Sequence, residues 1–371
     1  MKKSKLFRLK YFFTLGGLFF LVVFCNYLYA DSLENGKSSM SIFPILMYDT
    51  DIGLGYGGKG KFINYFSLDE SFDLILFNST KGEQWYVFTF SLPDFEIRQG
   101  KIYGLSLDIK AEYDKYLKYY FYGTGPDSRK DDETTFTFEK KELQLTLGRG
   151  FSTHLVIELT YFLKNIRYYR IEEGQIFTDE LRSIGEQFTP YVSSLFRYDT
   201  SDSRIHPKKG SSVWIQNDLA ANWLGNKKAN FYRFMLDVRK YFLVFGARDV
   251  FAIRGLVQKV SGAKIPLFEL PVLGGGSTTG ALRGYKMNRF IDKGKWLVNA
   301  EYRFPLWKKL GGNLLLDAGS VWPSFSEMFQ SAVKINAGWG LRYYLENFVV
   351  RFDMGFSQEG MGIYFNFGHI F

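Results

Sequence analysis

The chain has 371 residues, enough for one large domain or two ordinary ones, and 19% of the residues are aromatic. Its formal net charge is +9, but five basic residues lie in the first ten positions, so the rest of the chain carries about +4. Such a mild excess does not indicate a nucleic-acid-binding protein. The single cysteine, Cys25, lies close to the N-terminus and leaves the remainder of the chain without a disulfide or a cysteine metal ligand.

The first thirty residues have the pattern of a secretory signal peptide. A basic start precedes an apolar run over residues 11–24, and Ala30 is a small residue suited to cleavage. We therefore expect residues 1–30 to be a leader that is removed on export. An uncleaved membrane anchor is the alternative interpretation.

Beyond Ala30, no uninterrupted apolar run approaches the ~18 residues that a spanning helix needs. From Ser41 onward, segments of alternating apolar and polar residues recur to the end of the chain, and this period of two predicts β-strands. The predicted strands are 42–48, 54–66, 72–79, 84–92, 102–112, 138–148, 155–164, 191–199, 212–221, 231–241, 250–260, 297–304, 313–321, 334–344, 349–357 and 363–371.

The two faces of these strands differ in a way that indicates a membrane. In segments 297–304 and 313–321, apolar residues occupy one face without interruption, and the other face carries charges that include Glu301 and Asp317. A soluble sandwich would expose its charges to water, whereas a membrane barrel turns apolar residues to lipid and polar ones to its lumen. The abundant rings suit aromatic girdles at the two membrane interfaces. We predict an all-β fold, a transmembrane antiparallel β-barrel of about sixteen strands.

Connection lengths support this prediction. If both ends of the barrel are periplasmic, the long connections all fall on the outer side: 114–135, 168–187, 261–295 and 323–331. Short turns then fall on the periplasmic side, as in 67–71, 150–153 and 345–347. Outer-membrane barrels show this asymmetry. We therefore expect a leader (1–30), a short periplasmic segment (31–40) and a barrel (41–371) in the outer membrane of a Gram-negative type of bacterium.

Several motifs resemble the BamA/TamA superfamily of outer-membrane insertases and two-partner secretion pores, also called bacterial surface antigen barrels. The long connection 261–295 contains Leu282-Arg283-Gly284-Tyr285, which is similar to the (V/L)RG(F/Y) signature of the sixth outer loop in that family. Within the resemblance, Arg283, Gly284 and Tyr285 form a latch. Glu301 and Asp317 look like the lumen-facing carboxylates that receive the loop arginine.

Two further motifs strengthen the resemblance. Asp202, Arg204, Pro207 and Gly210 are similar to the D-x-R…P-x-x-G periplasmic turn of the family. The C-terminal Phe371, with alternate aromatics such as Phe367 before it, resembles the signal by which such barrels are recognised for insertion.

One departure limits what the resemblance implies. Family members with known roles carry periplasmic POTRA domains of several dozen residues before the barrel, and the roughly ten residues of 31–40 cannot build one. The chain thus resembles a short subfamily that lacks them. The implied function is assistance to protein or lipid insertion, or to translocation, at the outer membrane. The implied partners are the lipid bilayer, the barrel-assembly machinery for the chain's own insertion, and client barrel proteins or lipids, without nucleic acid.

Residue chemistry offers two functional hypotheses, each with an alternative. The planar, permanently charged fork of Arg283 suits a bridge between carboxylates in a lumen, whereas the alternative is a solvated arginine in a flexible outer loop. The seam between the first and last strands has Pro44, which lacks an N–H, and Gly368, which lacks a side chain. Such a seam could part sideways to admit a substrate; the alternative is ordinary closure, with Pro44 merely starting a strand.

No catalytic or metal-binding pattern stands out, so we expect no enzymatic activity, no catalytic residue, no metal and no cofactor. Residues 53–58 match a dinucleotide-binding glycine pattern, but no helix is predicted after them. Ser277 does not lie in a nucleophile elbow, and the three histidines are scattered. The acidic run 130–133 suits a solvated loop tip, with calcium binding as the alternative. A passive pore or structural surface antigen is the alternative function, and a barrel hydrolase is a third.

Overall fold

The computed structural model of the chain describes residues 38–49, 53–171, 186–225, 229–345 and 349–371. The predicted leader lies outside these residues, as do most of the predicted segment 31–40 and parts of the predicted connections 168–187 and 345–347.

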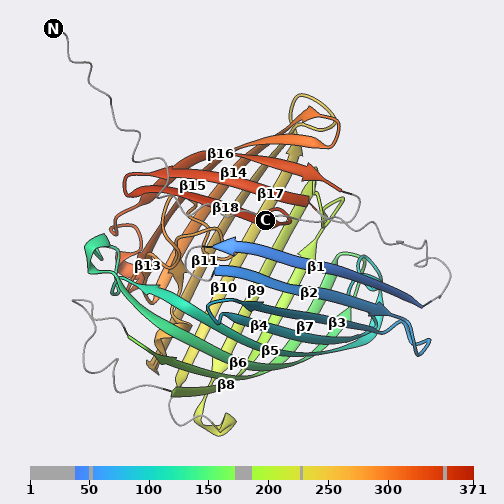
Figure 1. The fold of residues 1–371 in the computed structure, drawn as a ribbon, viewed down its shortest axis with the longest axis horizontal. Helices are drawn as coiled ribbons and strands as arrows, with labels where there is room; N and C mark the ends of the chain where they lie inside the picture. The colour runs from blue at the N-terminus through green and yellow to red at the C-terminus, as the bar shows by residue number, and fades with distance from the viewer. Residues whose placement is uncertain (1–37, 50–52, 172–185, 226–228, 346–348) are drawn as a thin grey trace.

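Sixteen strands form one antiparallel sheet in which each strand pairs with its neighbours along the chain, and the sheet curls into a barrel (Figure 1). The predicted fold class and strand number are confirmed. The strands are β1 Ser39–Asp49, β2 Gly53–Ile63, β3 Ser71–Ser79, β4 Gln84–Leu92, β5 Tyr103–Phe121, β6 Thr134–Gly150, β7 Leu155–Tyr169, β8 Glu186–Asp199, β9 Gly210–Ala220, β10 Asn230–Leu243, β11 Val250–Lys264, β14 Gly294–Trp307, β15 Leu310–Trp322, β16 Lys334–Tyr344, β17 Val349–Ser357 and β18 Gly360–Phe367.

The remaining elements are short and lie in the connections. Two-residue strands β12 (Val272–Leu273) and β13 (Phe290–Ile291) pair with each other between β11 and β14. The 3₁₀ turns are η1 Lys130–Asp132, η2 Asn222–Leu224, η3 Leu267–Glu269 and η4 Phe325–Glu327. No helix among the described residues has the length and apolar character to cross a membrane.

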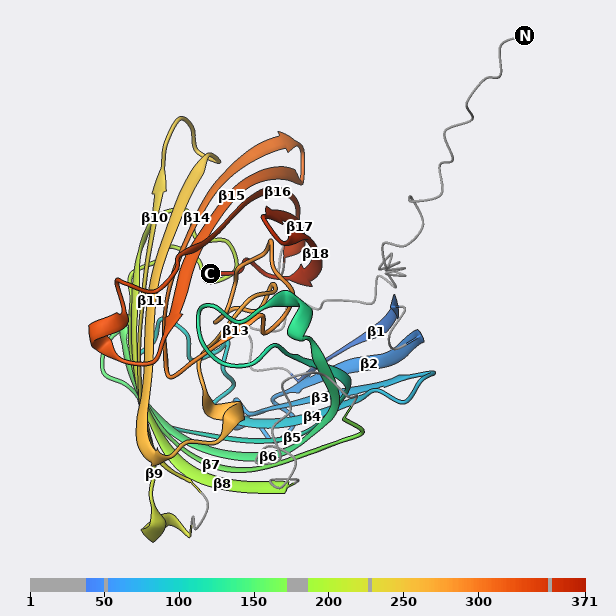
Figure 2. The ribbon, with the colours of Figure 1, turned by 90° about the vertical axis from the view of Figure 1, so that its left-hand side faces the viewer.

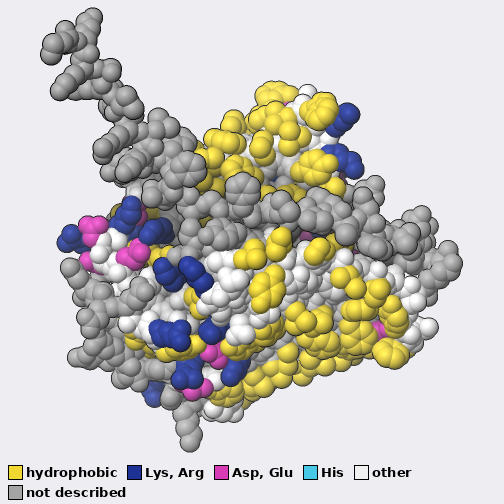
Figure 3. Space-filling model, in the orientation of Figure 1, with side chains coloured by type: hydrophobic (Ala, Val, Ile, Leu, Met, Phe, Trp, Pro, Cys, Tyr) yellow, Lys and Arg dark blue, Asp and Glu magenta, His cyan; other side chains and the backbone are white. Residues whose placement is uncertain are grey.

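The predicted alternation of faces is present in the folded strands. On β15, Leu314 and Leu316 are 53% and 50% exposed on the outer wall, whereas Asp317 is fully buried on the lumen side. Figure 3 shows hydrophobic side chains gathered over the near wall, with charged side chains toward the end where β5 and β6 meet. The exposed fraction of the side chains therefore distinguishes an apolar face that contacts the bilayer from a polar face that lines the interior.

The hairpin β5–β6 is longer than predicted. Its strands have 19 and 17 residues, against the ~9–11 that cross a bilayer, so the hairpin extends beyond the membrane. The prediction that 114–135 is all loop is wrong at both ends. The extension is stabilised because Tyr119, Phe136 and Phe138 pack their rings against Phe268 of the β11–β14 connection.

The predicted closing strand 363–371 is also too long. β18 ends at Phe367, and Gly368 adopts a left-handed φ of 78° that favours glycine. The chain then turns inward, so Phe371 packs in a buried cluster with Tyr241 and Val250 instead of facing lipid. Both ribbon views place the end of the chain within the ring of strands (Figures 1 and 2).

Candidate functional site

The connection between β11 and β14, residues 265–293, forms what we call loop 6, and it lies inside the barrel. Leu273, Leu282 and Phe290 of this loop are at most 1% exposed, and they pack in one cluster with the wall residues Leu256 and Leu297. In Figure 2 the β13 segment of the loop lies between opposite walls of the barrel. Loop 6 therefore has an apolar core of its own, which it shares with the lumen wall.

Arg283 of loop 6 is fully buried, and all three guanidinium nitrogens donate to carboxylates. Nε and Nη2 donate to the two oxygens of Asp317 at 2.9 and 2.7 Å, and Nη1 donates to Glu301 at 2.5 Å. Nη1 also donates to Asp353 of β17 at 3.2 Å. The structure thus brings together the loop arginine and the two carboxylates singled out in the sequence, and it adds a third.

Two amides hold Asp317 in place. Asn299 on β14 donates to Asp317 at 2.7 Å, and Asn336 on β16 donates to it at 3.0 Å. The Asn299 amide also donates to the carbonyl of Ala281 in loop 6 at 2.9 Å. Asp317 therefore receives hydrogen bonds from both neighbouring strands and from the loop, which leaves its carboxylate a single orientation.

Two further arginines complete the charge balance around Glu301 and Asp353. Arg342 donates to Asp353 at 2.7 Å and to Glu301 at 3.3 Å. Arg303 donates to the other oxygen of Glu301 at 2.8 Å and to the main-chain oxygen of Phe371 at 3.0 Å. We call Arg283, Glu301, Arg303, Asp317, Arg342 and Asp353 the lumen cluster.

The lumen cluster is stable only as a set. Removing charges from water costs several kcal/mol per ion, and the cost is offset only where good geometry satisfies the buried groups. Each carboxylate in the cluster has at least one arginine within 2.8 Å. Arg283 is the one arginine that pairs with Asp317 among the described residues, so loop position and lumen charge are coupled.

Glycines allow the main chain of loop 6 to lie directly on the wall. Gly355 of β17 and Gly362 of β18 face each other across the sheet, and a Cβ at either would collide with the carbonyl group of Arg283. A Cβ on Gly284 would lie 2.6 Å from the Cβ of Asn336. The two wall glycines, Gly355 and Gly362, form a slot for the loop at Arg283, and Gly284 allows the loop itself to approach the wall.

Tyr285 fixes the next part of the loop. Its hydroxyl donates to the carbonyl of Ile335 at 3.3 Å, and its ring meets that of Phe290 edge-on at 5.3 Å. Its own carbonyl accepts a hydrogen bond of 2.8 Å from the hydroxyl of Tyr364 on β18. Tyr285 therefore connects loop 6 to β16 and to the last strand of the barrel.

A second ionic contact ties loop 6 to the opposite wall. Glu269 in η3 is 2% exposed and lies 2.6 Å from Lys164 of β7 and 2.8 Å from Arg233 of β10. Arg233 also pairs with Asp218 of β9 at 2.5 Å. Burial raises the pKa of Glu269, but Lys164 and Arg233 outweigh burial and hold that pKa below its usual range. Glu269 is therefore a charged anchor.

Arg289 provides a third contact at the outer end of the loop. Its guanidinium pairs with Glu359, in the β17–β18 turn, at 2.7 Å and donates to Ser128, in the β5–β6 connection, at 2.9 Å. It also lies 4.8 Å from the centre of the Tyr122 ring. Loop 6 is thus held at three positions by elements from three parts of the barrel.

The seam lies between β1 and β18, the two ends of the sheet. In the strand order of the described residues, β1 pairs with β2 and β18 pairs with β17, and no ladder joins β1 to β18. Pro44 lies in the middle of β1, opposite Gly58, so it does not start the strand. Gly368 lies just beyond β18, where its N–H donates to Val349 at 2.7 Å, and not within the strand as predicted. The main chain of Phe367, in β18, pairs with Val350 of β17, and its side chain lies outside the described part of the structure.

The D-x-R…P-x-x-G residues form the turn between β8 and β9. Asp202 accepts a hydrogen bond of 2.9 Å from the N–H of Lys208, which closes the turn. Gly210 has a φ of 105°, and a Cβ there would collide with main-chain atoms of the facing strand end. Pro207 is buried and Arg204 is exposed. The motif therefore builds a tight turn that leaves Arg204 exposed.

Two of the three scattered histidines come together at the same end of the barrel. The rings of His206 and His369 lie 5.2 and 6.0 Å from the ring of Tyr344, on β16. Burial lowers the pKa of His206, and burial holds the pKa of His369 well below its usual range, an effect to which Arg303 adds. The described residues contain no group of three or more side chains suited to a metal ion.

Asp353, Glu269 and Arg289 were missed by the sequence analysis. For Asp353 a signal existed, because alternation in 349–357 places it on the polar face with the other lumen residues. Glu269 and Arg289 lie in a connection without periodicity, so no pattern marks them. Only the path of loop 6 through the lumen brings them to their partners.

Comparisons with known proteins place this geometry in a family. The family model described as the Omp85 superfamily domain matches residues 64–371. Among solved structures, the chain is similar to BamA from Haemophilus ducreyi lacking POTRA domains 1–3, with a TM-score of 0.63 and 16% identity over 89% of this chain and 69% of that chain. No curated protein matches the sequence.

Two further similar structures are CdiB from Escherichia coli and CdiB from Acinetobacter baumannii. Their TM-scores are 0.61 and 0.53, with 12% and 13% identity, and each alignment covers 89% of this chain. The chain spans 62% and 64% of these two proteins, less than two thirds of their length. At such identities the similarity to solved structures shows the fold alone, and the family match over 64–371 shows the membership. The chain is an outer-membrane β-barrel that belongs to the Omp85 superfamily.

Proposed function

We propose that this barrel assists the insertion or translocation of client proteins or lipids at the outer membrane, with its seam as the client's point of entry. The seam, where β1 and β18 lie at opposite ends of the strand order of the described residues, is the single observation that carries the proposal. Family membership supports a general role of this kind. The proposal includes export by the predicted leader 1–30 and recognition of the unfolded chain by the barrel-assembly machinery.

The physics of a sheet edge in lipid explains why the seam would attract a client. Backbone N–H and C=O groups without partners cost several kcal/mol each in the hydrocarbon region. An incoming strand can satisfy them by adding to an exposed edge. Pro44 offers no N–H at the centre of β1, so the ladders that β1 can form lack one donor. A client strand that pairs with β1 should therefore dissociate more readily than one that forms a complete ladder.

Loop 6 would serve as the internal support for this event. Arg283 and Tyr285 contact β15, β16, β17 and β18, so the loop braces the half of the barrel that ends at the seam. Glu269 anchors the same loop to β7 and β10. We infer that the loop keeps the barrel rigid while β1 and β18 separate.

The alternative, a passive pore or structural surface antigen, makes a different prediction for the lumen. A loop held inside by three ionic contacts argues against a wide, permanent channel. Swelling of liposomes that contain the barrel tests this point: steady solute entry that is unchanged after deletion of loop 6 would favour the pore.

The seam is testable because the chain beyond Cys25 has no cysteine. Pairs of cysteines, one replacing Pro44 or Ile42 of β1 and one replacing Ile363 or Phe365 of β18, would be oxidised to lock the two edges together. Proteoliposomes would then receive a urea-unfolded barrel client, and its folding rate would be followed by gel mobility. We expect the wild type to accelerate folding over empty liposomes, the locked barrel to lose the acceleration, and a reductant to restore it.

The control places the same two cysteines within an existing ladder, at Leu314 and Trp339, which pair between β15 and β16. This disulfide leaves the seam free, so the folding rate should match that of the wild type. Equal acceleration by the locked and unlocked seam would refute entry at the seam. Failure of the wild type to accelerate the client would refute the insertase role itself.

A further inference from the structure

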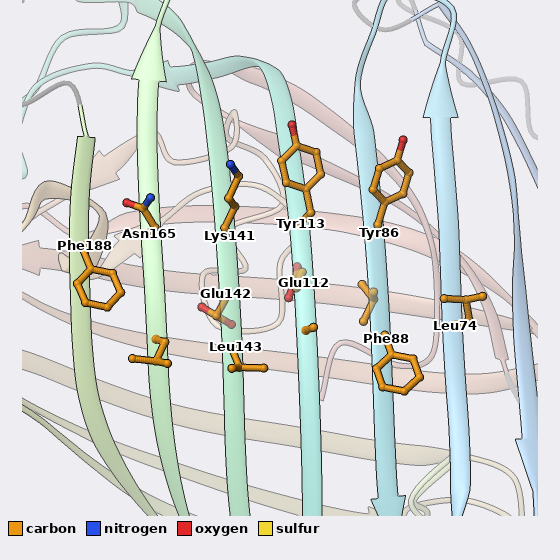
Figure 4. A pocket seen from close by; sticks show the side chains of 13 residues that line it. Leu74, Tyr86, Phe88, Glu112, Tyr113, Lys141, Glu142, Leu143, Asn165 and Phe188 are labelled. Carbon is orange, nitrogen blue, oxygen red and sulfur yellow. The ribbon is translucent and has the colours of Figure 1, made fainter.

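The outer wall of the barrel contains a groove that the proposed function does not use. It has a volume of about 490 Å³ and crosses β3 to β8 on the side that faces the bilayer (Figure 4). Leu74, Phe88 and Leu143, which line it, are between 37% and 42% exposed. This volume falls within the ~300–1,000 Å³ typical of small-molecule sites.

The groove exists because one position in a row of large side chains is small. Leu74, Phe88, Ala111, Leu143 and Leu163 lie side by side across five strands in continuous register. The single methyl group of Ala111 leaves a hollow between the Phe88 ring and the Leu143 side chain. This lower row is entirely apolar, as acyl chains require.

The next row toward the outer end of the barrel is amphipathic. Tyr86, Tyr113, Lys141, Asn165 and Phe188 are again in continuous register, one strand apart. Of these five residues only Lys141 is charged, and 64% of its side chain is exposed. Side chains two positions apart on a strand are separated by roughly 7 Å, so Lys141 lies above Leu143, on the strand next to the hollow at Ala111.

Lys141 is poorly neutralised by the protein. Its nearest carboxylate, Glu139, lies 3.7 Å away and also accepts a hydrogen bond from Tyr169 at 3.2 Å. The third row adds Lys115 and Arg167 on either side of Glu139. Figure 3 shows basic side chains, with acidic ones among them, at this end of the wall beyond the hydrophobic band.

We propose that this groove binds one acylated lipid of the outer leaflet through an acyl chain in the hollow at Ala111 and a phosphate headgroup on Lys141. The orientation follows from the barrel, since β5 and β6 join on the outer side. The apolar row and the single lysine in the row above it match the order of acyl chain and phosphate along such a lipid. The third row alternates cations and carboxylates: Lys115, Glu139, Arg167 and Glu186. A protein partner would have to reach the hollow from within the bilayer, so the charge and position together favour a lipid.

The test uses the full-length barrel in mild detergent with native mass spectrometry, which counts bound lipids. The probes are lipid A with its phosphates, lipid A from which the phosphates have been removed, and phosphatidylethanolamine. We expect one molecule of the phosphorylated lipid to bind, and its dephosphorylated form to bind about tenfold more weakly, because hydrogen bonds to charged groups are lost. The variant Lys141→Gln should bind both forms equally and weakly.

Ala111→Phe fills the hollow and should abolish retention of both forms. Its matched control is Ala300→Phe, which adds the same ring to the lipid-facing side of β14, between Ile253 and Leu316. Lys240→Gln, at the other end of the barrel, controls for charge. Both controls should bind as the wild type does.

Equal retention by Ala111→Phe and Ala300→Phe, or indifference of the wild type to the phosphates, would overturn the proposal. Folding of every variant is checked by the shift in gel mobility on heating. If Ala111→Phe does not fold, Ala111→Val and the phosphate dependence of Lys141→Gln decide the same question.

Discussion

Arg283 and Asp317 are joined by three hydrogen bonds, two from the guanidinium at 2.9 and 2.7 Å and one from the Arg283 main-chain N–H at 3.2 Å. The loop is therefore held to β15 by its backbone as well as by its side chain. A substitution at Arg283 removes only the side-chain hydrogen bonds and leaves the one from the main-chain N–H. Its consequences depend mainly on the carboxylates that the guanidinium leaves behind.

The first prediction concerns that loss. Arg283→Met should lower the free energy of unfolding by about 3–5 kcal/mol, because it leaves buried carboxylates with too few cations. Thermal unfolding and the rate of protease cleavage in loop 6 measure the effect. Arg283→Lys should restore little, since an ammonium cannot bridge Asp317 and Glu301 at once.

A double substitution tests whether the pair itself is responsible. Arg283→Met combined with Asp317→Asn removes one cation and one anion together, so its destabilisation should be smaller than the sum of the two single effects. Strict additivity, or unchanged cleavage of loop 6 in every variant, would leave the proposed latch without support.

The second prediction concerns the glycine slot. A Cβ at Gly355 collides with the carbonyl group of Arg283, so Gly355→Ala should displace loop 6 from the wall. We expect faster proteolysis of the loop and a lower unfolding temperature, at a cost of about 1–3 kcal/mol for overpacking. Gly255→Ala is the matched control, because Gly255 also lies within a strand and a Cβ there meets nothing within 4 Å. Equal effects at the two glycines would show that the slot is not required.

Strand number and wall polarity could be predicted from the sequence because period-two alternation is a local property. Glu301 and Asp317 were placed on the lumen side for this reason. The end of the chain was mispredicted because alternation in 363–371 continues past the point where Gly368 turns it inward. Phe371 then gains a buried site and a hydrogen bond from Arg303, and this tertiary contact outweighs the local pattern.

The path of loop 6 lies beyond such patterns. Glu269 belongs to a connection, and its partners Lys164 and Arg233 are distant in the sequence. Nothing local distinguishes these charges from those of a solvated loop. They pair only because the folded barrel brings β7 and β10 next to the same part of the loop.

The third prediction follows from this second anchor. Glu269→Lys places three cations together inside the barrel and should increase cleavage of loop 6 near η3, with a loss of roughly 3–5 kcal/mol in the free energy of unfolding. Exchange of the pair, Glu269→Lys with Lys164→Glu, should recover part of the loss. Lys101→Glu, at an exposed residue just before β5, is a surface control that should change the free energy of unfolding by no more than ~1 kcal/mol and leave cleavage of loop 6 unchanged. An exchanged variant as unstable as Glu269→Lys would contradict the pairing.

The last prediction concerns pH. The folded barrel holds the pKa of His206 and His369 below the usual value of 6.5, chiefly by burial, with Arg303 and Arg342 adding to the effect at His369. Folding therefore favours the neutral rings, and their contribution to stability is complete above about pH 6.5. The unfolded chain binds protons first as the pH falls below this value, so the barrel should lose stability progressively below about pH 6.5.

Thermal unfolding at pH 7.5, 6.5 and 5.5 measures this loss, and a variant with both histidines replaced by glutamine is the comparison. The variant should lose less stability than the wild type over this range, because the two histidines no longer titrate and most carboxylates titrate below it. His154→Gln is the control, since this residue lies apart from the pair in the turn before β7 and should leave the pH dependence unchanged. If the double variant loses as much stability as the wild type, the acid sensitivity arises elsewhere, and the contact of His206 and His369 with Tyr344 serves packing alone.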